Sequence, residues 1–409
     1  CDAAFITRLD SIAWILNIRG NDVPCNPVLL SHGIIHSNGN FDLFINKSKI
    51  SKNFNDHVGE NVKIHNETDI HSILSTLSGK NIQLDFNGSN AWSHELIINA
   101  GANVINRDDP CMLPKACKNN TEIQGMKNCH VRDAIAVCNF LSWLDEKIES
   151  NEMLDEGILS DKLDSFREEL DYFKGISFGT ISAAGKNAAM CHYSHKNQKI
   201  PSKLEMNSIY LVDSGGQYLD GTTDITRTVA IGMPTEFMKK MFTLVLKGHI
   251  SLGSSRFPEG IAGQHLDTLA RQYLWHHGYD FEHGTGHGVG SYLNVHEGPH
   301  SIGKGANNVP LRPGMVVSNE PGYYEENSFG IRCENLILVE EIDEINGKKL
   351  LGFKDLTIVP FDQKLIQKNM LNELEIKWIN DYHSHTWKKL NPLVNETVKK
   401  WLKHATRKI

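Results

Sequence analysis

The sequence contains no long hydrophobic run. No stretch approaches the roughly 20 apolar residues that a membrane-spanning helix needs, and no cationic segment followed by an apolar one begins the chain. Basic residues do not cluster except at 399–408, and the formal net charge is −7. We therefore expect a protein that binds neither membranes nor nucleic acid, and whose substrate is a small molecule or a peptide.

Cysteine pairs are also lacking. The chain has eight cysteines, but none of them forms a C-x-x-C pair or the short framework of a small secreted protein. This distribution predicts free thiols in a reducing cytoplasm. The chain begins with Cys1 rather than methionine, directly before an apolar-periodic run, so we expect it to be a fragment of a longer protein.

Two catalytic signatures are incomplete. Asp213-Ser214-Gly215 matches the D-[ST]-G motif of aspartic proteases, but that mechanism needs two carboxylates that share one proton, and a second copy is absent. The glycine-rich run at 284–290 satisfies neither the G-x-G-x-x-G pattern nor the Gly-Lys-Ser/Thr ending of a phosphate loop. The sequence therefore argues against both classes of site.

The length of 409 residues exceeds the size at which one hydrophobic core usually keeps growing, so we expect two domains and an appendage. Asp108-Asp109-Pro110 and Leu113-Pro114 interrupt the chain and mark the first boundary. The C-terminal residues are rich in Lys, Leu, Trp and Glu at helical spacing, which predicts a helical extension. The predicted domains cover residues 1–112, 113–362 and 363–409.

The first part mixes short helices and strands, which predicts a small α/β domain. Asn38-Gly39 between two apolar runs is a strong signal for a β-hairpin over 28–45. Hydrophobic periodicity predicts helices at 5–18, 70–77 and 93–100 and a strand at 82–86.

The second part begins with a T-x-x-Q capping box, Thr121 to Gln124, and an apolar-periodic run over 123–148, which together predict a helix. A second amphipathic helix is expected at 163–173, ended by Gly175. The remaining elements are expected strands at 209–213, 222–229, 315–320 and 331–339 and helices at 238–252 and 265–278.

Asp213 ends one predicted strand, and Asp224 lies within the next. Side chains alternate between the faces of a strand, so Thr222 and Thr226 share a face with Asp224. If the two strands pair as a hairpin, both carboxylates project into the same volume. Like charges there would repel by several kcal/mol unless a cation or a shared proton relieves them. On this pair alone, a metal site and two exposed acids are about equally compatible with the sequence.

Three further residues strengthen the metal interpretation. Glu320 closes one predicted strand and Glu334 lies inside another, where acids are rarely buried unless they are paired or coordinated. His287 lies among glycines that let the backbone approach a centre closely. The predicted ligand set is Asp213, Asp224, His287, Glu320 and Glu334.

Four carboxylates carry a charge that two divalent cations would neutralise. Oxygen-rich ligation with one imidazole suits Mn²⁺, Fe²⁺ or Co²⁺ and tolerates Zn²⁺. Such a pair of ions would activate a water and polarise a carbonyl, which predicts hydrolytic chemistry.

Four long blocks of sequence, in a family's order and spacing, carry a resemblance. The blocks are Asp213 to Thr228, His283 to Pro299, Ser318 to Tyr324 and Gly330 to Asn335. They resemble the Xaa-Pro aminopeptidases (aminopeptidase P) of the pita-bread metallopeptidase family. The resemblance implies an α/β (α+β) fold with a creatinase-like small domain, a pita-bread catalytic domain and the C-terminal extension of the long forms. Long forms carry another α/β domain upstream.

The resemblance also implies roles for individual residues. The five predicted ligands would bind two metal ions, commonly manganese, and Glu320 would also be the general base. His192, His283 and His296 match the outer histidines that bind substrate in that family, and His192 and His296 are the candidate proton shuttles. Arg332 would contact substrate and act as the hydrogen-bond partner of a ligating carboxylate.

The implied reaction removes the first residue from a peptide whose second residue is proline, and we expect a cytoplasmic homodimer. An X-Pro amide has no N–H, so the site must favour the shape of the ring and orient a carbonyl. The nearest alternative is a prolidase, which cleaves X-Pro dipeptides. A metal-free pita-bread binding module or creatinase-like enzyme is a more distant alternative, because such proteins lose ligands and all five are present here.

Overall fold

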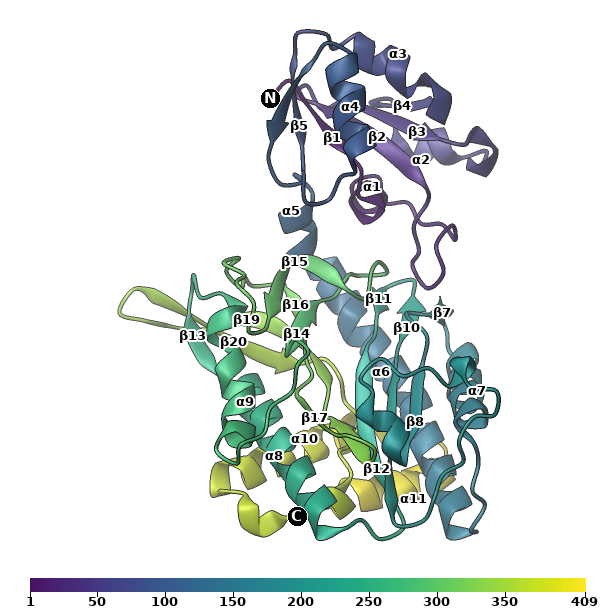
Figure 1. The fold of residues 1–409 in the computed structure, drawn as a ribbon, viewed down its shortest axis with the longest axis vertical. Coiled ribbons are helices and arrows are strands. Elements are labelled where there is room, and N and C mark those ends of the chain that lie inside the picture. Colours follow the sequence, from purple (N-terminus) through teal and green to yellow (C-terminus); the bar gives the residue numbers. More distant parts are fainter. The chain divides into compact units, whose positions relative to one another are not determined.

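The computed structural model describes residues 1–409. The chain forms two compact units, Cys1–Lys115 and Ala116–Ile409 (Figure 1). The predicted domain boundaries after residues 112 and 362 stay predictions. None of the helices combines the length and the apolar composition needed to cross a membrane.

The first unit is built on a six-stranded mixed sheet in the order β4-β3-β2-β1-β5-β6. The predicted hairpin is confirmed: β2 and β3 are antiparallel, and Gly39, with φ of +87°, turns the chain between them. The elements of this unit and of the segment that ends it are β1 (Ala3–Ile6), α1 (Leu9–Ile15), β2 (Ser31–His36), β3 (Phe41–Ile45), α2 (Phe54–Val58), β4 (Val62–His65), α3 (Ile70–Ser75), β5 (Asn81–Leu84), α4 (Ala91–Asn99), β6 (Asn103–Asn106) and α5 (Met112–Ala116).

The helix predicted at 5–18 is wrong in its first part. Ala3–Ile6 is a buried strand, β1, which pairs with both β2 and β5, and the helix begins only at Leu9. A strand that is buried on both faces does not alternate in polarity, so its apolar residues extend the periodicity of the following helix. The other predicted helices and the strand of this unit are confirmed within two residues at each end.

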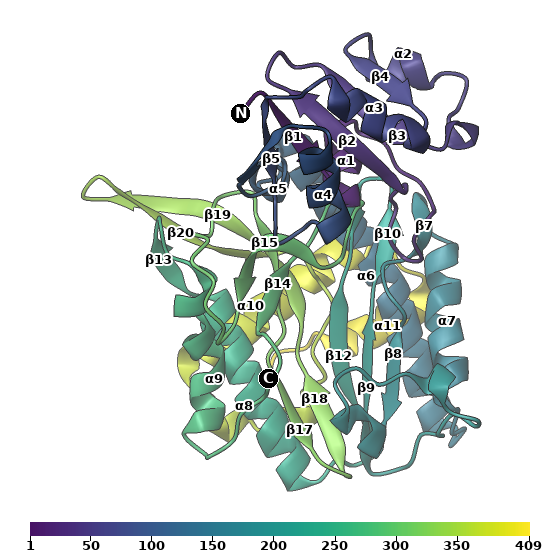
Figure 2. The same cartoon turned by 45° about the horizontal axis from the view of Figure 1, so that its top comes forward.

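The second unit carries a six-stranded sheet in the order β13-β20-β19-β16-β14-β15, two three-stranded sheets in the orders β12-β9-β8 and β11-β10-β7, and the two-stranded pair β17-β18 (Figure 2). Helices α6 and α7 pack against each other, as do α8 and α9. The elements are α6 (Asn120–Glu149), α7 (Glu156–Glu168), β7 (Phe173–Ile176), β8 (Ile181–Ala184), β9 (Ser208–Ser214), β10 (Gly216–Tyr218), β11 (Gly221–Thr222), β12 (Ile225–Ile231), α8 (Glu236–Gly253), β13 (Arg256–Pro258), α9 (Asp267–Trp275), β14 (Gly286–Gly288), β15 (Glu297–Ile302), β16 (Val316–Asn319), β17 (Gly322–Glu325), β18 (Phe329–Arg332), β19 (Asn335–Ile345), β20 (Lys348–Asp355), α10 (Glu373–Leu390) and α11 (Glu396–Ala405).

The predicted C-terminal helices are confirmed, and they complete the core of the second unit. Leu390 of α10 and Leu402 of α11 are fully buried in the same cluster as Phe140 and Leu144 of α6. The Trp401 indole also donates a hydrogen bond of 2.7 Å to the Asp145 carboxylate. Burial of side chains of this size typically contributes about 1.5–3 kcal/mol each, so α10 and α11 stabilise the unit that holds the candidate site.

The capping box predicted at Thr121 to Gln124 is placed two residues too late. Asn119 is the N-cap of α6: its side chain accepts hydrogen bonds from the backbone N–H groups of Thr121 and Glu122. The Glu122 carboxylate in turn accepts the Asn119 N–H at 2.9 Å. Asparagine is at least as good an N-cap as threonine, so the earlier box wins.

The helix predicted at 163–173 is also wrong in its bounds. Asp155 caps α7 by accepting the Ile158 N–H at 3.0 Å, so the helix begins at Glu156 and ends at Glu168. Residues 169–172 form a turn, and only Phe173, the last residue of the predicted helix, belongs to β7, which pairs with β10. The N-cap decided the start of this helix more strongly than the apolar pattern did.

Two strands predicted as continuous are interrupted, and both breaks fall at candidate ligands. The segment at 222–229 divides into β11 and β12, with Asp224 between them, and the segment at 331–339 divides into β18 and β19, with Glu334 between them. The remaining strands and the helices α8 and α9 are confirmed, with ends that differ by up to three residues.

Candidate metal centre

Asp213 and Asp224 come from two neighbouring strands. β9 and β12 pair antiparallel, with Asp213 opposite Thr226, and Asp224 lies just before β12 begins. Both carboxylates are buried, with 8% and 4% of their surface exposed. The predicted hairpin therefore exists, and it brings these two acids to the same end of the strand pair.

His287 lies on β14 of the six-stranded sheet, and Glu320 directly follows the neighbouring strand β16. The backbone N–H of Glu320 donates to the Thr285 carbonyl at 2.9 Å. The Ser318 hydroxyl accepts the His287 N–H and donates to Glu320 Oε1, both at 2.9 Å. The two candidate ligands are thus fixed to each other through the backbone and through one serine.

Glu334 connects the two groups. Its backbone N–H donates to the Thr226 carbonyl at 3.3 Å, and its Oε2 accepts the Thr226 hydroxyl at 2.7 Å. The side chain is almost completely buried. Leaving the strand at this point lets Glu334 reach across to β12, which a continuous strand over 331–339 would not do.

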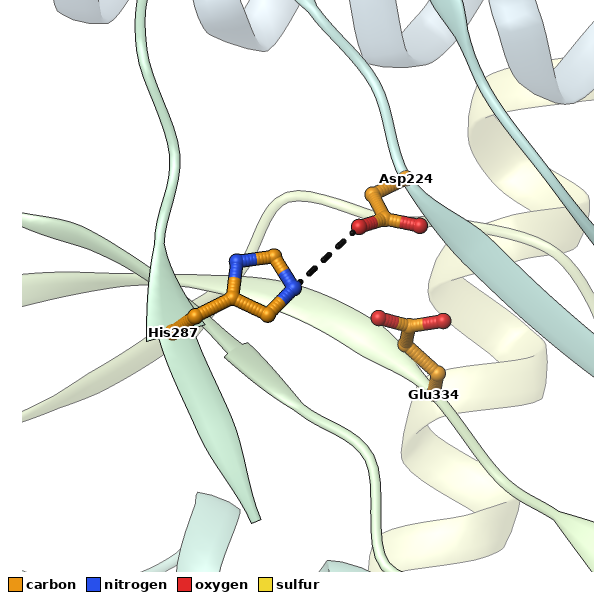
Figure 3. A group of neighbouring side chains, drawn as sticks. All are labelled: Asp224, His287 and Glu334. Atoms are coloured by element: carbon orange, nitrogen blue, oxygen red, sulfur yellow. Dashed lines mark ion pairs between the residues drawn. The ribbon is translucent and has the colours of Figure 1, made fainter. Parts of the chain in front are cut away.

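The side chains converge on one small volume. Ligand atoms of Asp224, His287 and Glu334 lie within 4.8 Å of one another (Figure 3). His287 Nε2 lies 3.5 Å from Asp224 Oδ2 and 3.3 Å from Glu320 Oε1. Asp213 lines the same cavity but lies outside that closest group: one of its oxygens accepts a hydrogen bond from Arg332.

Burial makes the negative charge of the cluster costly, and the pKa values of its acids reflect this cost. Burial raises the pKa of Glu320 to about 7. Burial, followed by the charges of Asp224 and Glu320, raises the pKa of Glu334 well above its ordinary value, and burial also raises that of Asp224. Burial opposes protonation of His287, but its hydrogen bond to Asp224 and the charge of Glu320 raise its pKa to about 9.

The residues fit a pair of divalent cations. Oxygen donors with one imidazole are the ligands that Mn²⁺ and similar ions prefer, and Asp213 Oδ1 is buried without a hydrogen-bond partner. His287 Nδ1 donates to the Gly288 carbonyl at 3.0 Å, which leaves Nε2 as the nitrogen available to an ion. A buried acceptor without a donor is costly in a native protein unless a cation or water satisfies it.

The three outer histidines surround the same cavity, whose volume is about 630 Å³. His283 Nδ1 donates to the Gly284 carbonyl at 2.8 Å, so its Nε2 accepts the Tyr324 hydroxyl at 2.7 Å. His296 lies edge-on to His287, with 4.3 Å between ring centroids. Burial lowers the pKa of His283 and of His296 to about 4, and nearby cationic groups add to the effect. Both rings are therefore neutral at pH 7.

His192 is the third outer histidine and is exposed to the cavity. It lies on the loop after β8, which the Glu156 carboxylate fixes by accepting the Ala184 N–H at 2.8 Å and the Tyr193 hydroxyl at 2.7 Å. The loop is therefore held from both sides of His192 by one buried acid.

Arg332 links two of the candidate ligands, Asp213 and Glu334, in one hydrogen-bonded network. Its guanidinium donates to Asp213, to the Thr226 hydroxyl at 3.0 Å and to the Tyr324 hydroxyl at 2.8 Å. Thr226 in turn donates to Glu334. Sequence reasoning placed Arg332 beside a ligating carboxylate but missed Tyr324, which links it to His283; the Pro-Gly-Tyr-Tyr run after Glu320 was the available signal.

An apolar wall of the cavity was also missed. Ile181 of β8 is paired with Asp213 of β9, so the two side chains share one face of the sheet. Phe178, in the turn before β8, lines the same cavity. The sequence carried no signal for this wall, because the register of β8 on β9 depends on chain segments that are distant in sequence.

Gly175-Ile176-Ser177-Phe178-Gly179 matches the G-x-S-x-G pattern of serine hydrolases. That motif requires a serine exposed on a tight strand-to-helix turn. Here Ser177 is buried, and its hydroxyl donates to the Thr223 carbonyl at 2.9 Å. The structure therefore gives this serine no nucleophilic role.

Comparison with known families gives three matches along the chain. Metallopeptidase family M24 matches residues 124–341, the creatinase/prolidase N-terminal domain matches 1–122, and the C-terminal region of M24 peptidases matches 349–409. The three matches together span nearly the whole sequence.

Individual relatives agree with these matches. The probable Xaa-Pro aminopeptidase P of Talaromyces marneffei is 44% identical over 99% of this chain, which spans 64% of that protein's length. The crystal structure of X-prolyl aminopeptidase from Caenorhabditis elegans, described as a cytosolic enzyme with a di-nuclear active site, is 38% identical with a TM-score of 0.94, over 100% of this chain and 68% of that one. An Xaa-Pro dipeptidase from Bacillus anthracis, at 23% identity and a TM-score of 0.69 over 88% of this chain and 94% of that one, shares the fold.

Proposed function

The chain belongs to metallopeptidase family M24, and from this premise we propose that it releases the first residue of peptides whose second residue is proline. The observation that carries the proposal is the convergence of the predicted ligands from five separate places in the chain: four of them line one cavity, and a ligand atom of Glu334 lies within 4.8 Å of those of Asp224 and His287. The di-nuclear active site described for the relative from Caenorhabditis elegans supports it. The chain covers about two thirds of that relative, so the activity of the longer protein is part of the proposal.

Two divalent ions, which we propose to be Mn²⁺, would be held by the five predicted ligands. Fe²⁺ and Co²⁺ suit the same donors, and Zn²⁺ is tolerated by them. When bound, the ions would supply Lewis-acid polarisation of a carbonyl and a lowered pKa for water. The ligands are Asp213, Asp224, His287, Glu320 and Glu334.

The side chains around this centre have proposed roles in proton transfer and substrate binding. Glu320 is the proposed general base, because its carboxylate faces the cavity and its backbone is fixed by Thr285. His192 and His296 are exposed to the cavity and are the proposed proton shuttles and substrate ligands. His283, fixed by its bonds to Gly284 and Tyr324, is the third proposed substrate ligand.

Arg332 is proposed to orient Asp213 and to contact the substrate, since it donates to that carboxylate and also lines the cavity. Ile181 and Phe178 offer apolar surface beside Asp213, against which a proline ring or an apolar side chain can pack. A proline nitrogen in peptide linkage carries no hydrogen, so recognition of that residue depends on shape rather than on a hydrogen bond.

The cellular setting is part of the same proposal. We propose a cytoplasmic enzyme, which the description of the relative from Caenorhabditis elegans as cytosolic supports. The homodimer and the three-domain division at residues 112 and 362 remain proposals on the strength of the family resemblance.

Peptide length separates the proposed activity from that of a prolidase. With Mn²⁺ present, we expect release of the first residue from an X-Pro-Y tripeptide with kcat/KM at least about tenfold above that for the X-Pro dipeptide, because the relatives at 44% and 38% identity are described as aminopeptidases rather than dipeptidases. The measurement is amino-acid release by chromatography, with the matching X-Ala-Y tripeptide as the control for proline selectivity. Faster cleavage of the dipeptide would identify a prolidase, and cleavage of neither would reject peptidase activity in this chain.

A further inference from the structure

Arg271 is a fully buried cation that the proposed chemistry does not use. It lies in α9, and its guanidinium stacks on the Phe281 ring with 3.7 Å between the guanidinium carbon and the ring centroid. A charged group with no exposed surface is retained only if partners satisfy it. Those partners all belong to α9 or to the segment 280–285.

The guanidinium gathers that segment around itself. Nε donates to Asp267 Oδ2 at 2.7 Å, and Nη1 donates to Asp280 Oδ1 at 2.9 Å and to the Phe281 carbonyl. Nη2 donates to the His283 carbonyl at 2.9 Å. The other oxygen of Asp267 accepts the Thr285 hydroxyl. With a longer contact of 3.4 Å from Nη2 to the Thr285 hydroxyl, Arg271 therefore holds the segment at four residues, namely 280, 281, 283 and 285.

The segment leads directly into the candidate site. The imidazole of His283 lines the cavity, and the Thr285 carbonyl accepts the backbone N–H of Glu320 at 2.9 Å. Gly284 and Gly286 flank Thr285, and glycines leave a backbone free to move unless something holds it. Arg271, which does not line the cavity, supplies that restraint.

The restraint also reaches another wall of the cavity. Asp280 uses its second oxygen to accept Lys304 Nζ at 2.7 Å, and Lys304 lies in the segment 303–307, which lines the cavity. Burial opposes ionisation of Asp280, but its hydrogen bonds with Lys304, Trp275 and Arg271 lower its pKa to about 2, so it is an anion at neutral pH. Asp280 therefore links the two cavity walls through Arg271 and Lys304.

Arg167 shows what a purely structural buried arginine looks like in the same unit. It is equally buried, and it donates to Asp133 Oδ1 at 2.8 Å and Oδ2 at 3.2 Å, which joins α7 to α6. Neither residue lines the cavity. The difference between the two arginines is the segment that each one holds.

We propose that Arg271 is a positioning residue, which acts on the reaction by holding His283 at the place where substrate binds. The inference rests on the proposed function for the role of His283, but the restraint itself does not. Lysine cannot replace Arg271 in this role, because one ammonium group cannot reach Asp267, Asp280 and the His283 carbonyl together.

Amide hydrogen exchange tests the restraint without any assay of activity. In the metal-free full chain, Arg271→Lys is expected to speed exchange of the amides at 281–286 by about tenfold or more. In the unaltered protein, local opening of this segment must break its four hydrogen bonds with Arg271, and in the variant it does not. Arg167→Lys is the matched control and should leave those amides unchanged. Equal exchange in Arg271→Lys and the unaltered protein overturns the proposal. If Arg271→Lys does not fold, Asp280→Ala, which removes the acceptor of Arg271 Nη1, is read in the same way.

Kinetics then test whether the restraint acts through His283. Arg271→Lys should raise KM for an X-Pro-Y tripeptide by about tenfold with kcat changed less than threefold, and in a His283→Ala background it should add less than about twofold. Arg167→Lys should not change KM. Independent effects of Arg271→Lys and His283→Ala on KM contradict the proposal. If the unaltered protein with Mn²⁺ releases nothing, the proposed function fails, and the exchange experiment still decides whether Arg271 holds the segment.

Discussion

Replacing Glu320 by glutamine is expected to lower kcat for release of the first residue from an X-Pro-Y tripeptide by about 10³-fold, within the range for loss of a positioned general base. Glutamine keeps the size of the side chain and can still accept the Ser318 hydroxyl, but it cannot accept a proton at neutral pH. The backbone bond from Glu320 to Thr285 does not involve the side chain, so the fold should persist. The measurement is kcat at saturating substrate with added Mn²⁺.

Glu326→Gln is the control for this variant. Glu326 is exposed between β17 and β18, six residues further along the chain, and does not line the cavity. Its replacement should leave kcat unchanged. Metal content should be measured for both variants, because Glu320 is also a proposed ligand. A kcat for Glu320→Gln within threefold of the unaltered protein would remove Glu320 from the mechanism.

Replacing Glu334 by glutamine should have opposite effects on the metal-free and the metal-loaded protein. In the metal-free protein, burial and the neighbouring carboxylates raise the pKa of Glu334 well above its ordinary value, so ionisation of this side chain opposes folding. Neutral glutamine relieves that repulsion, and the thermal midpoint of the metal-free variant should be higher than that of the unaltered protein.

Added Mn²⁺ should reverse that order. An ion that binds only the folded state stabilises it by about 2.7 kcal/mol when its concentration is 100 times Kd, and the variant lacks one charged ligand for it. We expect the unaltered protein to gain the larger increase in thermal midpoint and the variant to lose activity by about 10²-fold or more. Glu340→Gln, on β19 and outside the cavity, is the control. An equal Mn²⁺ response in Glu334→Gln and the unaltered protein would contradict its role as a ligand.

The same charges fix the sign of the pH dependence. Between pH 4.5 and about 7, folded metal-free protein binds a proton at Glu320 that the unfolded chain releases, and His287 acts in the same direction between 6.5 and about 9. The free energy of unfolding contributed by these groups therefore falls as the pH rises through these windows. Bound metal should reverse the slope at low pH, because protons then compete with the ions for the same ligands.

The family and the fold could be predicted from the sequence because their signals are local and repeated. The four blocks around the ligands, in order and at the right spacing, led to the pita-bread metallopeptidases, and the matches over 1–122, 124–341 and 349–409 confirm both the resemblance and the predicted fold class. The Asn38-Gly39 hairpin succeeded for a similar reason, since two residues with a strong turn preference define it.

The predictions that failed depended on contacts that the sequence does not display. β1 is too short and too buried to show the alternation of a strand, so its last two residues were included in the helix predicted at 5–18. The start of α7 depended on the Asp155 cap rather than on the apolar stripe. Glu334 looked like part of a strand because its neighbours are apolar, whereas its bonds to Thr226 pull it out of the ladder.

In the candidate site too, some residues could be predicted from the sequence and others could not. Residue type and motif were enough to select the ligands and the outer histidines, and the structure places all of them at or beside one cavity. The groups that hold them act through hydrogen bonds that only the folded chain displays: Arg271 donates to the His283 carbonyl, and Tyr324 donates to His283 Nε2 from 41 residues away. No pattern within either segment specifies such a partner.

The most direct test of the account is anomalous diffraction from crystals of the protein loaded with Mn²⁺, recorded at an energy where manganese scatters anomalously. The account predicts two peaks separated by about 3.5–4 Å, both surrounded by Asp213, Asp224, His287, Glu320 and Glu334. A single peak, no peak in this cavity, or two peaks bound by other side chains would contradict it.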